Sequence, residues 1–408
     1  MRVCGGIALA LLFLAAGCAR TAATKAPQAG VLFEDDAAFL KQHTKVVILG
    51  AEGGPRVAVN PDLQGRVMTS TAGGKEGLSF GWINRDLLAS GRNDPHMNAF
   101  GGEDRFWLGP EGGQYSIFFK AGAPFDLANW YTPPPLNEGA FEVVAQEPNA
   151  ITLHRAFRLV NYSGTAFEAD VTRTVRIPES IGDGIPVPAG VKTVVYESEN
   201  RLTNAGSQPW VKETGLLSIW ILGMFNPSPE TTIVIPFKPG PESELGPVVN
   251  DAYFGKVPAD RLVIKEGVLF FKGDGKYRSK IGISPLRVKP VLGSYDAANK
   301  VLTIVLFKVP GNTTDYVNSM WQIQDKPYGG DAANSYNDGP ASPGAKPLGP
   351  FYELESSSPA LALKPGESYT HTHTTIHYQG DETALDRIAR GVLGVGIEEI
   401  KAAFRSSN

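Results

Sequence analysis

The residues best suited to chemistry fall in a Gly-rich segment between His96 and Gln114. Acids, an arginine, a histidine and a tryptophan stand there among glycines and prolines, a composition that favours a site-forming loop over a buried strand. Carboxylates that accept paired hydroxyls, beside an aromatic face that covers apolar C–H surface, are suited to a sugar. The alternative is an acidic turn in which Arg105 pairs with Glu103 or Glu111 to hold the loop. The candidate site residues of this segment are His96, Glu103, Arg105, Trp107, Glu111 and Gln114.

A second polar segment runs from Trp321 to Pro340 and follows a predicted strand. It is rich in hydrogen-bonding side chains and carries a tryptophan and two tyrosines that can stack on a ligand. The alternative is a long surface loop with ordinary turn chemistry in its Asn-Asp-Gly triplet. The candidate ligand-binding residues here are Trp321, Asn334, Tyr336 and Asp338.

A third segment carries two glutamates on a predicted strand. Glu353 and Glu355 share one side of that strand, and Leu354 faces the other side, because side chains alternate along a strand. One sheet face therefore carries carboxylates, which are able to transfer protons.

Three histidines follow on the next predicted strand. His371 and His373 lie about 7 Å apart between their α-carbons, within reach of a shared metal, whereas His377 lies too far along the strand to join them without a bulge. We interpret all three as ordinary polar strand residues and keep His371 and His373 as weak metal candidates. No cofactor is expected.

Most of the remaining chain predicts β structure. Short β-branched or alternating segments bounded by Gly, Pro, Asn and Asp predict an all-β fold, an antiparallel β sandwich. Helical spacing occurs only at residues 36–43 and at residues 382–404, where Gly394 and Gly396 break it. We predict one domain over residues 31–408 with a short C-terminal helical segment. The predicted strands are 46–49, 56–59, 66–69, 116–119, 150–153, 169–177, 193–202, 215–222, 231–236, 261–271, 280–283, 301–308, 351–355 and 369–378.

The N-terminus has the pattern of an export signal. Arg2 precedes a short apolar run that ends in Leu14-Ala15-Ala16-Gly17-Cys18, which resembles the lipobox of bacterial lipoproteins. We predict a signal peptide over residues 1–17, lipidation of Cys18 and a flexible tether over residues 18–30. The protein is then anchored in the cell envelope by acyl chains, with the outer membrane favoured because Ala19 follows the cysteine. An ordinary cleaved signal with a stray cysteine is the alternative.

Charge and cysteine content exclude several classes of partner. The formal net charge is −4 and no basic run exists, so nucleic acid is not expected as a partner. Cys4 lies in the predicted signal and Cys18 carries the predicted lipid, which leaves no thiol for a disulfide, a thiolate metal site or a cysteine nucleophile.

Three motifs together resemble the galactose mutarotase-like superfamily. Leu354-Glu355 followed by Leu363-Lys364-Pro365-Gly366-Glu367 resembles its C-terminal signature, residues 59–70 resemble its opening strand, and residues 199–206 resemble its central strand with an Asn-x-Gly turn. The combination is most similar to an uncharacterised lipoprotein branch, a family known as a domain of unknown function (DUF6786). The resemblance implies a β-supersandwich with a carbohydrate-binding cleft on its concave face.

The resemblance also implies catalytic roles. A late-strand glutamate acts as general base on the anomeric hydroxyl in mutarotases, and its Leu-Glu context maps that role to Glu355. The family's mid-chain histidine, which protonates the ring oxygen, has no counterpart, because no histidine lies between His154 and His371. Candidates for a substitute acid are His96, Glu103 and Glu111.

Three function classes remain open. The first is an enzyme on sugars, either an epimerase or mutarotase with Glu355 as base, or a glycan-cleaving enzyme in which Glu103 and Glu355 flank a glycosidic bond. The second is a noncatalytic glycan-binding lipoprotein that uses Trp107, Trp321 and Tyr336. The third is a structural envelope protein without a ligand.

Overall fold

The computed structural model describes residues 30–179 and 187–405. The predicted signal peptide, both cysteines and all of the predicted tether except Gly30 lie outside the described residues. Across the described ranges, no helix is both long and apolar enough to span a bilayer.

Three sheets with antiparallel pairing form the body of the molecule. The ten-stranded sheet has the order β11 (Leu262–Lys265), β12 (Val268–Lys272), β10 (Thr231–Pro236), β14 (Val291–Asp296), β15 (Val301–Phe307), β18 (Ser368–Gln379), β8 (Lys192–Asn204), β7 (Ala166–Arg176), β6 (Ala150–Val160) and β5 (Glu142–Glu147). The five-stranded sheet has the order β13 (Ser279–Ile283), β16 (Ala333–Asn337), β17 (Tyr352–Ser357), β9 (Ser218–Phe225) and β4 (Arg105–Gly109). The three-stranded sheet comprises β1 (Val47–Leu49), β2 (Arg56–Asn60) and β3 (Arg66–Thr71).

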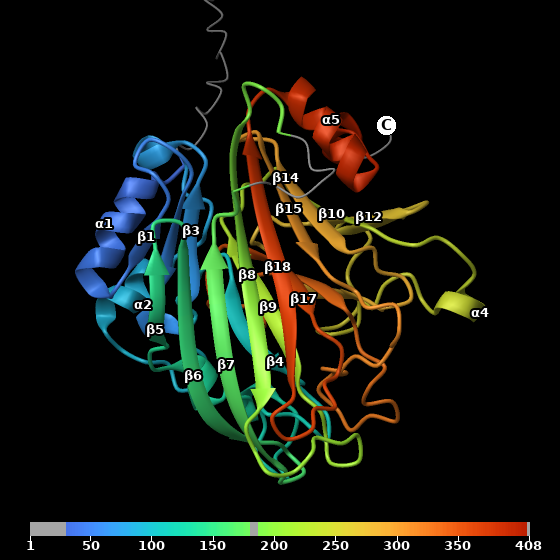
Figure 1. The fold of residues 1–408 in the computed structure, drawn as a ribbon. Helices are drawn as coiled ribbons and strands as arrows, with labels where there is room; N and C mark the ends of the chain where they lie inside the picture. Colours follow the sequence, from blue (N-terminus) through green and yellow to red (C-terminus); the bar gives the residue numbers. More distant parts are fainter. Residues whose placement is uncertain (1–29, 180–186, 406–408) are drawn as a thin grey trace, which may run out of the picture.

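Helices are short and lie at the margins of the sheets. In Figure 1, α1 and the three-stranded sheet stand on one side of the ten-stranded sheet, and α5 lies toward its other end. The helices are α1 (Phe33–His43), α2 (Arg85–Ser90), α3 (Pro134–Asn137), α4 (Glu242–Leu245), α5 (Glu382–Leu393) and α6 (Ile397–Lys401), with single 3₁₀ turns at Pro61–Leu63, Gly74–Glu76 and Leu127–Asn129. The predicted all-β antiparallel sandwich with a short C-terminal helix is confirmed.

The two larger sheets pack face to face through an apolar core. Side chains such as Phe106 and Ile221 of the five-stranded sheet join Val171 and Leu202 of the ten-stranded sheet in one buried cluster. Because alternate residues of a strand face opposite ways, the inward position of Leu354 directs its neighbours to the outer face of the five-stranded sheet.

Helix α5 covers part of the outer face of the ten-stranded sheet. Its buried residues Leu385, Ile388 and Leu393 pack in one cluster with apolar residues of that sheet such as Ile376. The helix begins at an Asp381 cap and ends at Gly394, whose φ of 77° suits glycine. The predicted helical segment and its break are thus present.

Two candidate segments contain strands where we predicted loops. β4 and β16 are both fully buried, although glycines and prolines surround them in the sequence.

The predicted strand at residues 116–119 is irregular in the structure, because the Ser116 hydroxyl accepts a hydrogen bond from the Phe118 backbone N–H at 3.0 Å and competes with strand pairing. The predicted strand at 261–271 is the hairpin of β11 and β12, with Gly267 in its turn at a φ of 74°.

A polar layer crosses the core between the two larger sheets. The Arg173 guanidinium pairs with Asp104, bonds the Asn200 side chain and donates from Nε to the Gly65 carbonyl at 2.9 Å. Both charged side chains are completely buried. Such a pair is costly to break, because removing one charge leaves the other buried and uncompensated.

Replacing Asp104 with Asn should therefore destabilise the fold by roughly 3–5 kcal/mol, because the Arg173 charge loses its counterion. Urea unfolding followed by circular dichroism measures this loss. The matched control is Glu168→Gln, which breaks the exposed pair of Glu168 with Arg158 and should cost about 1 kcal/mol or less. Equal losses in the two variants would show that the buried pair has no special role.

Candidate active site

Polar side chains from four strands converge on the outer face of the five-stranded sheet. In one row across the sheet, Lys280 of β13 lies opposite Tyr336 of β16, which lies opposite Glu353 of β17. In the next row, Asn334 of β16 lies opposite Glu355 of β17, and Arg105 of β4 follows one strand further on, beyond Leu222 of β9. The register therefore gathers two acids and two cations on one face. The sequence predicted Arg105, Asn334, Tyr336 and Glu355 as site residues, and these four do come together.

Glu355 accepts two hydrogen bonds on one of its oxygens. The Lys280 ammonium lies 3.1 Å and the Trp220 indole N–H 2.9 Å from its Oε2 atom, and the Glu355 side chain is completely buried. Its Oε1 atom has no hydrogen-bond partner among the residues that the structure describes. Since buried polar atoms are normally paired, this oxygen is available to a ligand.

Lys280 lies in an environment that favours its charged form. Burial opposes the ammonium of Lys280, but Glu355, Glu111 and Glu353 together hold its pKa above the ordinary value. The ammonium also lies 4.6 Å from the centroid of the Trp220 ring, a cation–π contact.

Glu353 has a different environment from Glu355. Burial raises the pKa of Glu353 to about 8, Arg105 opposes the rise and the charge of Glu355 adds to it. Arg105 donates to Glu353 at 2.8 Å and stacks over the Trp107 ring at 4.1 Å from its centroid. Burial lowers the pKa of Arg105 as well, but a guanidinium keeps its proton, so Glu353 is the partner that becomes neutral. Burial and the charge of Glu355 thus favour the protonated form of Glu353, and Arg105 favours its carboxylate.

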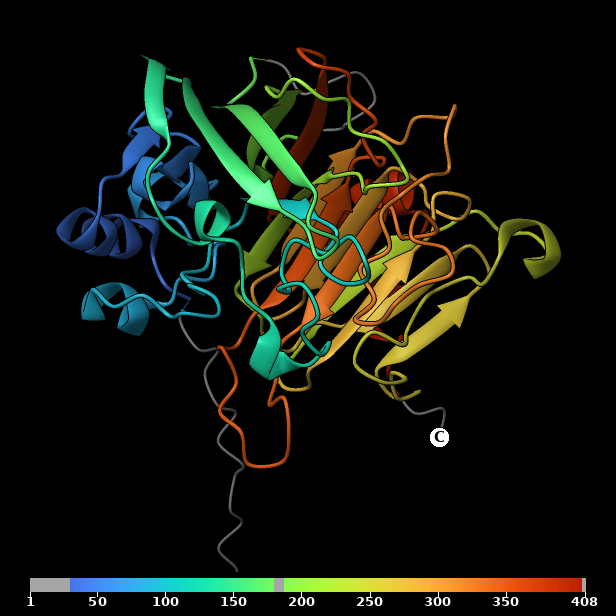
Figure 2. The same ribbon diagram turned by 90° about the horizontal axis from the view of Figure 1, so that it is seen from below.

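Loop residues complete the site. Burial raises the pKa of Glu111, and the nearby Lys280 opposes that rise. Gln114 joins the loop after β4 to the loop after β15, because its amide donates to the Gln324 carbonyl at 2.8 Å and accepts from the Gln324 N–H at 3.0 Å. In Figure 2 the teal segment after β4 and the orange segment after β15 lie close together. The hydroxyl of Tyr336 donates to Asp338 at 2.8 Å, which places Asp338 behind the site.

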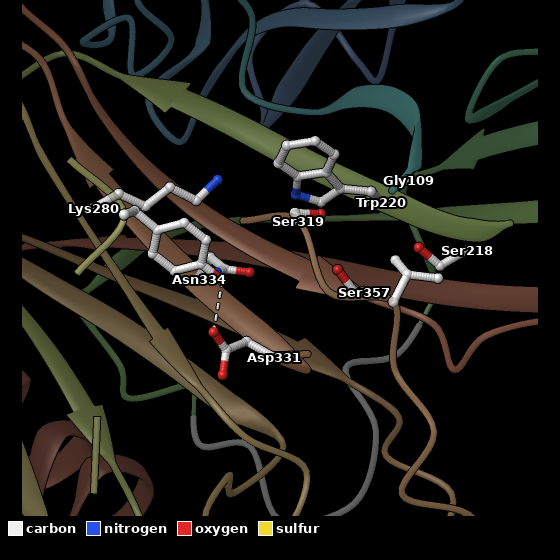
Figure 3. Close-up of a pocket in the computed structure, with 10 residues that line it drawn as sticks. Gly109, Ser218, Trp220, Lys280, Ser319, Asp331, Asn334 and Ser357 are labelled. Atoms are coloured by element: carbon white, nitrogen blue, oxygen red, sulfur yellow. Dashed lines mark hydrogen bonds between the residues drawn. The ribbon is translucent and has the colours of Figure 1, made fainter. Parts of the chain in front are cut away.

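The site is closed in this structure. The side chains of Arg105, Glu353 and Lys280 are 3%, 7% and 6% exposed. Beside Lys280 and Trp220 lies a cavity of about 10 Å³, the room of about one water molecule. Figure 3 shows Lys280, Trp220 and Asn334 around it. The covering loops over this face are residues 91–104, 110–133, 246–261 and 308–332. A ligand as large as a sugar ring has room at the carboxyls only if these loops move aside.

Several residues of this site escaped the sequence analysis. Lys280 lies on a predicted strand, where a lone lysine is usually solvent-exposed, and Trp220 is one of several apolar residues on β9. Tyr253 donates to Asp331 at 2.6 Å on the wall of the small cavity. Tyr253 belongs to no motif, and Asp331 lies in the second polar segment but was not among its candidates. The one available signal was the alternation of side chains along β13. Ile281 and Ile283 face the core, so Lys280 faces the outer side of the sheet.

Glu103 and His96 do not face Glu355. The Glu103 carboxylate lies toward the ten-stranded sheet, where it accepts from the Ser70 hydroxyl at 2.8 Å and lies 3.1 Å from Nε2 of His377. The chain bends at Glu103, before β4 begins at Arg105, so the alternation along β4 does not extend back to Glu103. His96 lies at the surface of the covering loops, where its Nδ1 lies 2.6 Å from the Trp130 carbonyl.

The histidines of β18 lie between the sheets. His371 and His373 each approach the Ser356 hydroxyl at 2.8 Å, and burial lowers their pKa values to about 3 and about 4. They are therefore neutral near pH 7. Within residues 30–179 and 187–405, no three His, Cys, Asp or Glu side chains cluster as metal ligands.

A larger cleft lies elsewhere. It measures about 550 Å³ and opens between the N-terminal segment and the end of the sandwich. His377 is among its lining residues, but the ring nitrogens of His377 already face Glu103 and Thr303 at 3.1 and 2.9 Å. The acid–base pair of β17 thus lies outside this cleft.

The fold and the site define an antiparallel β-sandwich protein with two buried, cation-paired carboxyls on one sheet. The chain belongs to the family of unknown function DUF6786, whose model matches residues 31–404, as the sequence motifs predicted. No curated protein matches the chain.

Solved structures are similar to this chain at low identity, and two of the three described next carry mutarotase names. A galactose mutarotase related enzyme from Lactobacillus acidophilus is 9% identical, with 83% of this chain and 99% of that chain covered and a TM-score of 0.46. A galactose mutarotase-like protein from Lactobacillus casei ATCC 334 is 11% identical, with 82% and 99% covered and a TM-score of 0.45. The Slr1438 protein from Synechocystis sp. PCC 6803 is 13% identical, with 83% and 96% covered and a TM-score of 0.48.

The raised pKa of Glu353 makes stability depend on pH. A carboxyl whose folded pKa of about 8 exceeds its ordinary value of 4.5 stabilises the fold fully below about pH 4.5, and this contribution is lost as the pH rises toward 8. Replacing Glu353 with Gln should flatten the decline between pH 5 and pH 8 by up to about 1.4 kcal/mol per pH unit. Urea unfolding at four pH values measures the slopes.

The control for this experiment is Glu367→Gln, which changes an exposed carboxyl on a turn before β18. Its unfolding free energies should run parallel to those of the wild type. Parallel curves for Glu353→Gln as well would mean that Glu353 is ionised in the folded protein.

Proposed function

We propose that this protein acts on sugars as a proton-transfer enzyme of the epimerase or mutarotase kind, with Glu355 as general base and Glu353 as general acid. The observation that carries the proposal is the pair of carboxyls on β17 with different environments. Glu355 pairs with a lysine and has a free oxygen, whereas burial keeps the proton on Glu353 near neutral pH. Two adjacent carboxyls with separated protonation states are suited to paired acid–base catalysis.

Each proton in the proposed reaction has a defined origin and destination. Glu355 removes the proton from the anomeric hydroxyl while Glu353 donates its proton to the ring oxygen. The bond between the anomeric carbon and the ring oxygen breaks, and the open-chain aldehyde forms. After rotation of the aldehyde, the same steps in reverse close the ring as the other anomer and restore both carboxyls. Glu353 thus protonates the ring oxygen, the role of the family's mid-chain histidine, which this chain lacks.

Lys280 and Arg105 support these roles by electrostatics. Lys280 stabilises negative charge on Glu355 from the Oε2 side, which leaves Oε1 without a partner. Arg105 stabilises the negative charge that Glu353 acquires when it gives up its proton. The covering loops exclude water once the sugar is bound, which strengthens both interactions.

Noncatalytic glycan binding is the second candidate, and the closed site favours it. The cavity beside the carboxyls has room for about one water molecule, so a glycan can reach only the aromatic side chains on the outside of the covering loops. Hydrolysis by Glu103 and Glu355 has no support from the structure, because the Glu103 carboxylate bonds with Ser70 and His377 instead.

Replacing Glu355 or Glu353 with Gln should lower the rate of anomeric exchange by about 10²–10⁴-fold, because each change removes one proton-transfer group. Sugar affinity should stay within about tenfold for Glu355→Gln. Exchange of the anomeric proton signals by NMR, with a panel of reducing sugars, measures the rate. The control Glu168→Gln alters an exposed carboxyl on β7 and should leave the rate unchanged. Full activity in Glu355→Gln would rule out the proposed base.

We also propose that Cys18 anchors the protein in the envelope through lipid, as the lipobox-like sequence indicates. Replacing Cys18 with Ser should move the protein from the membrane fraction to the soluble fraction of the cell. Fractionation followed by immunoblotting measures this shift. Continued sedimentation of Cys18→Ser with membranes would contradict the lipid anchor.

A further inference from the structure

Aromatic rings from separate loops form a continuous arc over the candidate active site. The ring centroids of Trp130 and Trp321 lie 6.1 Å apart, and those of Trp321 and Phe254 lie 6.3 Å apart. We call Trp130, Trp321 and Phe254 the aromatic arc. At one end Trp130 lies 6.3 Å from Trp107 of β4, and at the other end Phe254 lies 6.1 Å from Tyr336 of β16. The arc therefore bridges the two sides of the sheet face that holds Glu353 and Glu355.

The arc continues onto the surface of the molecule. Trp321 and Phe254 are only half-buried. Beside Trp130, Tyr131 is 38% exposed, and its ring stacks on His96 at 4.1 Å between centroids. Ile323, two residues beyond Trp321, is 62% exposed. Large apolar side chains that gather around one site commonly mark a place where a ligand binds.

The chemistry of the arc suits sugar rings. Aromatic faces cover the apolar C–H faces of sugars, and polar groups at the edges bind their hydroxyls. Arg278 lies 3.7 Å over the Phe254 ring, which places guanidinium N–H donors at one end of the arc. His96 supplies a polar ring beside Tyr131 at the other end. Trp130 is buried, so the rings that a ligand can reach are the half-buried Trp321 and Phe254, 6.3 Å apart and nearly perpendicular, and the exposed Tyr131. These separate rings offer more stacking positions than one sugar ring can use.

We propose that the ligand is an oligosaccharide and not a free monosaccharide, an inference that rests on the proposed function. The reducing-end sugar occupies the site of Glu353 and Glu355, where its anomeric carbon reacts. The next sugars of the chain stack on Trp321 and Phe254 or leave across Tyr131. The arc thus sets the chain length that the protein prefers.

Calorimetry with malto-, cello- and chito-oligosaccharides of one to six units tests this proposal. Affinity in the best series should rise at least tenfold from the monosaccharide to the trisaccharide. The variants Tyr131→Ala and Phe254→Ala should each remove at least fivefold of that gain while changing the monosaccharide affinity less than threefold. The matched control is Phe39→Ala, a half-buried aromatic residue on α1 that lies outside the arc, and it should keep the full gain.

Three outcomes would overturn the proposal: an affinity that does not depend on chain length, a gain that persists in both arc variants, or no binding of any chain in the three series. Anomeric exchange measured on the same chains separates this inference from the proposed function. A chain-length effect on binding with full exchange in Glu355→Gln would remove the proposed base but keep the oligosaccharide. Exchange that requires Glu355 but is equal for all chain lengths would keep the base and remove the oligosaccharide.

Discussion

The burial of two carboxyls side by side on β17 is the constraint on which the rest of the site depends. Each has a cation within hydrogen-bond distance, and that cation stabilises the charged form of the carboxyl. The cations come from the two edge strands of the five-stranded sheet, Lys280 from β13 and Arg105 from β4. Both reach diagonally: Lys280 stands in the row of Glu353 but pairs with Glu355, and Arg105 stands in the row of Glu355 but pairs with Glu353. Strand order and register must both be correct for either pair to form.

This arrangement produces a difference between two chemically identical groups. Glu355 has an ammonium and an indole N–H on one oxygen, whereas Glu353 has one guanidinium contact and the neighbouring charge of Glu355. Burial then acts on the less supported carboxyl and keeps it protonated. An acid and a base on the same strand face can act on two oxygens of one sugar ring. The aromatic arc above them supplies the apolar surface that such a ligand needs.

The sequence predicted the fold better than it predicted the site. Alternating β-branched segments and the spacing of Leu385, Ile388 and Leu393 were sufficient for the sandwich and its C-terminal helix, because both follow from burial periodicity. β4 and β16 were missed because flanking glycines and prolines obscured five-residue alternations, and those two strands carry Arg105 and Tyr336. Glu355 was assigned from its Leu-Glu context. Lys280 and the protonation of Glu353 depend on strand neighbours far apart in the chain, which spacing along one strand does not reveal.

The protonation state of Glu353 is the central claim, and infrared spectroscopy measures it directly. A neutral carboxylic acid gives a C=O stretching band that a carboxylate lacks, and the difference spectrum between wild type and Glu353→Gln isolates the band of this residue. The account predicts that the band is present at pH 7 and disappears as the pH rises through about 8. Absence of the band at pH 6 would show that both carboxyls of β17 are ionised and would contradict the acid–base pair.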